Sequence, residues 1–88
     1  METKSVIIKN KTGLHARPAS IFVKTAGGFK SDINLQKGNA KASAKSLINI
    51  LALGLSEGAE ITITASGEDE KEAVNTLADL INSKFGEE

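Results

Sequence analysis

The 88-residue sequence predicts an α/β (α+β) fold, in which residues 1–88 form one domain built as a two-layer open-faced sandwich. Four short segments are β-branched or alternate polar and apolar residues, as strands do. Three other segments carry apolar residues at helical spacing. The resulting order is β-α-β-β-α-β-α. In this order three helices can cover one face of a four-stranded antiparallel sheet.

The first strand and the first helix lie on either side of a short loop. Residues 4–8 are rich in β-branched side chains and predict a strand, and residues 10–13 predict the loop. The helix begins at Ala16 and is predicted by apolar residues at i, i+3, i+4 and i+7, which are Ala19, Phe22, Val23 and Ala26. Gly27 and Gly28 end it, as C-terminal glycines commonly do.

A hairpin and a short helix follow. Residues 32–36 and 40–43 alternate polar and apolar side chains around a turn at residues 37–39, which predicts two paired strands. Ser46 has the residue type of an N-cap for a helix over residues 47–53. This helix is unusually apolar, since it contains Leu47, Ile48, Ile50, Leu51 and Leu53. One helix face cannot hold all five, so we expect some of them to be exposed.

The last strand and helix come from the C-terminal third. Residues 60–64 alternate cleanly and predict a strand. Asp69 and Glu72 have the spacing of an N-cap with a reciprocal glutamate, which predicts the start of a helix. The apolar stripe of this helix consists of Val74, Leu77, Ala78, Ile81 and Phe85, and Gly86 is predicted to close it.

The composition excludes several classes of protein. There are no cysteines, so neither disulfides nor thiolate metal sites are possible. No apolar run approaches the roughly 20 residues of a membrane span, and the N-terminus lacks the basic and apolar regions of a signal peptide. We therefore expect a soluble, cytoplasmic protein with no direct membrane insertion. We also expect the protein to be a monomer.

The charge is zero overall but differs sharply between the two halves. Residues 1–45 carry nine basic and two acidic side chains, whereas residues 46–88 carry two basic and nine acidic ones. One interpretation is that the halves attract each other in the folded chain. The other is a basic patch near His15 that attracts an acidic partner, with the candidates Lys9, Lys11, Arg17, Lys24 and Lys45.

The most informative segment is Thr12-Gly13-Leu14-His15-Ala16-Arg17-Pro18-Ala19-Ser20, which holds the only histidine, arginine and proline of the chain. With His15 at the N-cap, the imidazole lies beside a helix N-terminus, where N–H groups favour an anion. A neutral imidazole nitrogen is a nucleophile, and Arg17 offers a fork of donors that matches phosphate. The segment is compatible with a simple polar cap, but it also has the parts of a histidine that carries a phosphoryl group.

The motif Gly13-Leu14-His15-Ala16-Arg17-Pro18-Ala19 resembles the active-site signature of HPr, the histidine-containing phosphocarrier family of the bacterial sugar phosphotransferase system. The likeness extends over the whole chain and includes Lys45-Ser46-Leu47-Ile48. It implies that His15 accepts a phosphoryl group at Nδ1 from phosphorylated enzyme I and passes it to the IIA domains of sugar permeases. Arg17 would stabilise the phosphoryl group. The resemblance implies no bound metal or cofactor, and a carrier rather than an enzyme.

The same resemblance gives Ser46 and the apolar helix a second role. In Gram-positive members the matching serine is phosphorylated by HPr kinase/phosphorylase, and the product binds a catabolite-repression regulator. Leu47, Ile48 and Leu51 would form part of the surface that binds partners. Many members have methionine and glycine at the positions of Ile48 and Asn49. The presence of His15 argues against the regulatory paralogues that lack this histidine.

Two other classes of function compete with that of a carrier. A regulatory adaptor would act mainly through Ser46, without phosphoryl flux through His15. A nucleic-acid-binding module is disfavoured, because the chain has no tyrosine or tryptophan and its strands carry no phenylalanine for base stacking.

Overall fold

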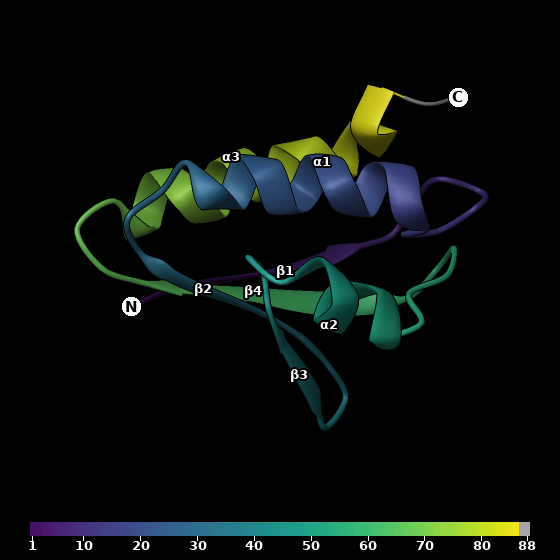
Figure 1. The fold of residues 1–88 in the computed structure, drawn as a ribbon, viewed down its shortest axis with the longest axis horizontal. Helices are drawn as coiled ribbons and strands as arrows, with labels where there is room; N and C mark the ends of the chain where they lie inside the picture. The colour runs from purple at the N-terminus through teal and green to yellow at the C-terminus, as the bar shows by residue number, and fades with distance from the viewer. Residues whose placement is uncertain (87–88) are drawn as a thin grey trace.

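The computed structural model describes residues 1–86 and has the predicted order of elements (Figure 1). The strands are β1 (Glu2–Ile7), β2 (Asp32–Lys37), β3 (Ala40–Ser43) and β4 (Glu60–Ser66). The helices are α1 (Ala16–Gly27), α2 (Leu47–Ala52) and α3 (Glu70–Asn82), followed by a short 3-10 turn, η1 (Lys84–Gly86). The predicted fold class is therefore confirmed.

The four strands form one antiparallel sheet in the order β1-β4-β2-β3. The register places Val6 opposite Ile61, and Leu35 opposite both Ile63 and Ala42. All five of these side chains are buried, whereas their neighbours along each strand are exposed or half-buried. This alternation assigns one face of the sheet to the core and leaves the other open, as a half-buried antiparallel sheet requires.

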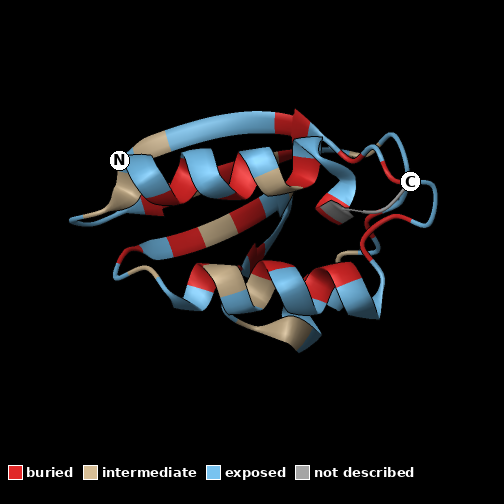
Figure 2. Ribbon diagram, turned by 90° about the horizontal axis from the view of Figure 1, so that it is seen from above, coloured by how far each residue is buried: buried red, intermediate tan, exposed pale blue. Residues whose placement is uncertain are grey.

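Helices α1 and α3 lie over the core face of the sheet (Figure 1) and contact each other. Their buried residues line the sides that face each other, as Figure 2 shows. Phe22 of α1 and Leu77 and Ile81 of α3 are fully buried in the core. Helix α2 packs against α1 and β3 and contributes the fully buried Ile50. Within residues 1–86, no helix is long and apolar enough to cross a membrane.

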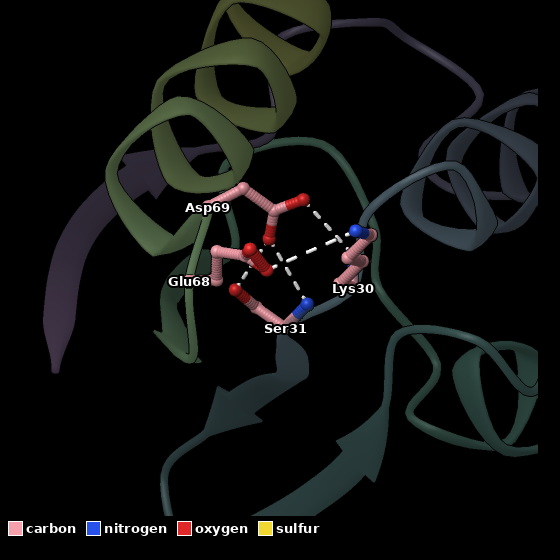
Figure 3. A network of polar contacts seen from close by, with 4 residues as sticks. All are labelled: Lys30, Ser31, Glu68 and Asp69. Atoms are coloured by element: carbon pink, nitrogen blue, oxygen red, sulfur yellow. Dashed lines mark hydrogen bonds and ion pairs between the residues drawn. The ribbon is translucent and has the colours of Figure 1, made fainter.

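The start of α3 differs from the predicted capping box. Asp69 occupies the N-cap, but its side chain makes no capping hydrogen bond. Its carboxylate instead accepts hydrogen bonds from Lys30 N at 2.9 Å, Ser31 N at 3.0 Å and Ser31 Oγ at 2.6 Å (Figure 3). Glu70, not Glu72, reaches back along the chain and accepts from Gly67 N at 3.0 Å. The predicted pairing of Asp69 with Glu72 is therefore wrong. The Asp69 carboxylate accepts hydrogen bonds from Lys30 and Ser31 and so does not cap the helix.

The Asp69 contacts join the α1–β2 connection to the start of α3. Ser31 is fully buried, and Lys30 Nζ adds an exposed ion pair with Glu68 at 3.8 Å (Figure 3). The hydrogen bond from Ser31 Oγ, followed by that from Lys30 N, holds the pKa of Asp69 below its ordinary value of 3.8. The ionised carboxylate is thus the form that this connection stabilises.

Lowering the pH is expected to weaken the fold through Asp69. Because the folded pKa is the lower one, the stabilisation is fully present above the ordinary value of 3.8 and is lost as the pH falls through the folded pKa. Urea unfolding at a series of pH values checks this. Asp69→Asn should be less stable at neutral pH and should lose less stability in acid than the parent chain.

The control for this prediction is Glu68→Gln, which removes a carboxylate that is 71% exposed and should change stability little. Some acid dependence will remain in Asp69→Asn. The pKa of Glu70 is also lowered, first by its hydrogen bond with the N-terminal amine and then by that from Gly67 N. If the free energy of unfolding fell equally in acid for Asp69→Asn and for the parent, Asp69 would not have the role that we give it.

Several strands and helices begin or end at residues other than those predicted. β1 runs over Glu2–Ile7 and β4 extends to Ser66. α3 ends at Asn82, so Phe85 does not continue it and Gly86 does not close it. The backbone φ of Phe85 is 55°, which turns the chain within η1 and still buries the ring against the core. The apolar residue was thus correctly predicted as core, but in the wrong element.

Candidate functional site

His15 lies at the N-cap of α1, as predicted. Its backbone is extended, with φ −85° and ψ −169°, and its carbonyl accepts the first helical hydrogen bond from Ala19 N at 2.9 Å. The side chain makes no capping hydrogen bond and is exposed. Pro18 is buried at the third helical position, where a missing N–H costs nothing. The sequence therefore places an exposed imidazole at a helix N-terminus.

The start of α1 offers donors for an anion. The N–H groups of Ala16 and Arg17 lie in the first turn, where the helix provides no acceptor for them. The Arg17 side chain is exposed in the same turn, and the positive end of the helix dipole adds to its charge. Together these groups can bind the oxygens of a phosphoryl group beside His15.

The loop before His15 is fixed to the loop after α2. Leu14 is buried, and its N–H donates to Leu55 O at 2.9 Å. Ile8 N donates to Ala59 O at 2.9 Å, and Gly58 N donates to Ile8 O at 2.8 Å. The segment that carries His15 is therefore held by backbone hydrogen bonds to a distant part of the chain.

The predicted basic residues are all exposed, and three of them lie on or beside α1 at increasing distance from its start. Arg17 and Lys24 lie at opposite ends of α1, about 10 Å apart along its axis. Lys45 lies near the far end, since its Nζ donates to Phe29 O at 2.8 Å. Lys9 lines a shallow groove along β1 with Glu60 and Asn82. Arg17, Lys24 and Lys45 therefore extend the positive charge along α1 away from His15.

Ser46 is half-buried and is the N-cap of α2, with Oγ accepting from Asn49 N at 3.5 Å. The cap prediction is confirmed, although the hydrogen bond is long. Lys45 ties this end of α2 to the C-terminal end of α1. Leu55, just beyond the other end of α2, holds the loop before His15. Helix α2 thus separates Ser46 from His15 along its length.

The apolar residues of α2 divide between core and surface, as predicted. Ile48 is 79% exposed and Leu51 is 39% exposed, whereas Leu47 is half-buried and packs against the core. The sequence reasoning missed Ile21, which is 37% exposed on the neighbouring α1. Its position outside the apolar stripe of α1 was the available signal. Exposed apolar side chains therefore occur on both helices.

Among residues 1–86, no three or more histidine, cysteine, aspartate or glutamate side chains are placed to hold a metal ion. The chemistry available at the start of α1 is that of an imidazole, an arginine and backbone N–H groups.

Comparisons with known proteins match nearly the whole chain. The family model described as the PTS HPr component phosphorylation site matches residues 2–83. The HPr-like protein Crh of Bacillus subtilis is 43% identical over 84 residues, covering 96% of this chain and 99% of Crh. The crystal structure of HPr-C-His from Thermoanaerobacter tengcongensis is 53% identical, covers 100% of this chain and 99% of its own, and superposes with a TM-score of 0.97.

The fold and the match to the phosphorylation-site family model place the chain among the small phosphocarrier proteins. The chain belongs to the HPr family of the phosphotransferase system. A crystal structure of Bacillus subtilis Crh, described as a dimer with a swapping domain, is 43% identical, covers 96% of this chain and 97% of its own, and has a TM-score of 0.77. The monomeric state predicted from the sequence is therefore not confirmed.

Proposed function

We propose that His15 accepts a phosphoryl group from phosphorylated enzyme I and delivers it to the IIA domains of sugar permeases. The observation that carries this proposal is the position of His15 as an exposed N-cap beside the first-turn N–H groups and Arg17. Membership of the HPr family supports it. The protein would act as a cytoplasmic carrier.

The transfer requires the neutral imidazole and no bound cofactor. The Nδ1 lone pair attacks phosphorus, and a P–N bond forms as the bond between phosphorus and the donor breaks. The three phosphoryl oxygens then lie within reach of the Ala16 and Arg17 N–H groups and the Arg17 guanidinium. These donors would stabilise the negative charge in the transition state and in the phosphorylated carrier. Delivery to the IIA domain is the same step in reverse, with a new acceptor.

Labelling with phosphoenolpyruvate and enzyme I tests the proposal. The protein should acquire one phosphate that is labile in acid and stable in base, located at His15 by mass spectrometry. Addition of a IIA domain should remove it. A chain that acquires no label under conditions that phosphorylate another HPr would exclude the carrier function.

A second candidate function is a regulatory adaptor that acts mainly through Ser46. The position of Ser46 at the N-cap of α2 and the 43% identity to Crh favour it. HPr kinase/phosphorylase would add a phosphate there, and the product would bind a catabolite-repression regulator. A phosphate at a helix N-terminus is electrostatically favoured, so the modification would not disrupt α2. Its charge would act at the surface that we propose for the partners, which includes Ile48 and Leu51.

Ser46→Asp is expected to slow phosphorylation by enzyme I and to leave the fold intact. Aspartate is a good N-cap, so stability should change by less than about 1 kcal/mol. The added negative charge should weaken docking of an acidic partner and raise the KM for the carrier. Steady-state transfer and urea unfolding measure the two effects. The control is Ser46→Asn, because asparagine is a neutral N-cap. If enzyme I phosphorylated the two variants at equal rates, Ser46 would be only a helix cap.

A further inference from the structure

Asn10 has an unusual environment for a polar side chain in a loop. It is 1% exposed and is one of two buried polar residues in the described part of the chain, the other being Ser31 of the Asp69 connection. Its side-chain Nδ2 donates to Gly13 O at 2.6 Å. Its backbone carbonyl accepts a hydrogen bond from Gly13 N at 3.0 Å. Asn10 thus closes the turn of residues 10–13 from both sides.

This turn lies between the two points at which backbone hydrogen bonds join the His15 segment to the neighbouring loop. Backbone hydrogen bonds to Ala59 and Gly58 hold Ile8, and the bond to Leu55 holds Leu14. Between these anchors, Lys11 and Thr12 are exposed. The amide of Asn10 therefore fixes the peptide group of Gly13, which lies two residues before His15.

The orientation of that peptide group bears on the chemistry of His15. Gly13 O is part of the Gly13–Leu14 peptide, so its direction helps to set the path by which the chain enters α1. The same path sets the backbone of His15 and the direction of the first-turn N–H groups. Displacement of a reacting group by about 1 Å can lower a rate by about a hundredfold. A buried hydrogen bond at this point is therefore placed to control transfer.

We propose that Asn10 is a positioning residue for phosphoryl transfer, which holds His15 and the N-terminus of α1 in the geometry of the reaction. The inference rests on the proposed function of His15. Asn10 acts through the Gly13 carbonyl and lies outside the exposed surface of Arg17, Ile48 and Leu51. Its loss should therefore lower the maximal rate of transfer and leave the KM for the carrier nearly unchanged.

The test compares Asn10→Leu and Asn10→Asp with the parent in steady-state phosphorylation by enzyme I. Leucine keeps the volume and removes the donor, whereas aspartate keeps the shape and directs a carboxylate at the Gly13 carbonyl. Both variants should lower kcat by about tenfold to a hundredfold, with KM changed by less than about twofold. Asn75→Ala, on the exposed face of α3, is the matched control and should behave as the parent.

The outcomes are distinguishable. If the parent accepts phosphate and Asn10→Leu keeps its kcat, Asn10 only fills space and the inference is wrong. If the parent accepts none, the proposed function fails and the inference fails with it. If neither variant folds, hydrogen exchange of the Asn10 side-chain amide in the parent decides the matter. Protection supports the hydrogen bond to Gly13, and exchange at the rate of an exposed amide excludes it.

Discussion

Replacement of His15 by alanine is expected to abolish phosphoryl acceptance from enzyme I and to leave the fold unchanged. The imidazole is the only nucleophilic nitrogen that the sequence places at this helix start, so no other group can form the P–N bond. The side chain is exposed and makes no capping hydrogen bond, so its removal leaves no cavity in the core. Phosphate incorporation and urea unfolding, measured on the same preparation, separate the two effects.

The control for this variant is Asn39→Ala, in the exposed β2–β3 turn, which should accept phosphate at the parent rate. His15→Asn provides a second comparison, because asparagine is a favoured N-cap but has no imidazole. It should be at least as stable as the alanine variant and equally inactive. Acid-labile phosphate on either His15 variant would refute the assignment of His15.

Gly13→Ala is expected to be the most destabilising of the substitutions considered, by about 2–5 kcal/mol. Gly13 has a φ of +68°, which L side chains rarely adopt. An added Cβ would also lie 2.8 Å from the Cα of Ser56 and closer still to the carbonyl oxygen of Leu55. These are backbone atoms that cannot move aside without breaking the hydrogen bond from Leu14 N to Leu55 O. Urea unfolding gives the change in the free energy of unfolding.

Gly38→Ala separates the two parts of this cost. Gly38 has a similar φ of +59° in the β2–β3 turn, but an added Cβ there would meet nothing within 4 Å. Its substitution should cost only the conformational strain, about 1–2 kcal/mol. If both variants lost the same stability, the close approach of the residue 13 and residue 55 loops would contribute nothing.

The sequence predicted the features that depend on local pattern. The apolar stripe through Phe22 and Ala26 located α1, and the alternation of residues 60–64 located β4. His15 could be placed at the N-cap because Pro18 and the stripe together fix where the helix begins. The motif then gave the family, which the comparisons confirm. Each of these inferences needs only residues within about two helical turns of each other.

The features that depend on distant partners could not be predicted in the same way. Asp69 has the residue type of a helix cap, yet it binds Ser31, 38 residues earlier in the chain. The exposure of Ile21 depends on how much of α1 is covered by α2 and α3. The contact of Gly13 with Leu55 appears only when two loops are brought together. Local spacing contains no information on these approaches, because folding, not sequence proximity, creates them.

The strand order also determines when during synthesis the site becomes complete. β1 lies at the edge of the sheet and pairs with β4. Val6 therefore cannot pair until Ile61 has been synthesised. Pairs so distant in sequence close late, because a long loop loses more entropy than a hairpin. A nascent chain that ends within α2 already contains His15, but not Leu55 or the strand that pairs with β1. A ribosome-bound or truncated chain thus contains the His15 motif before the contacts that hold the motif in place can form.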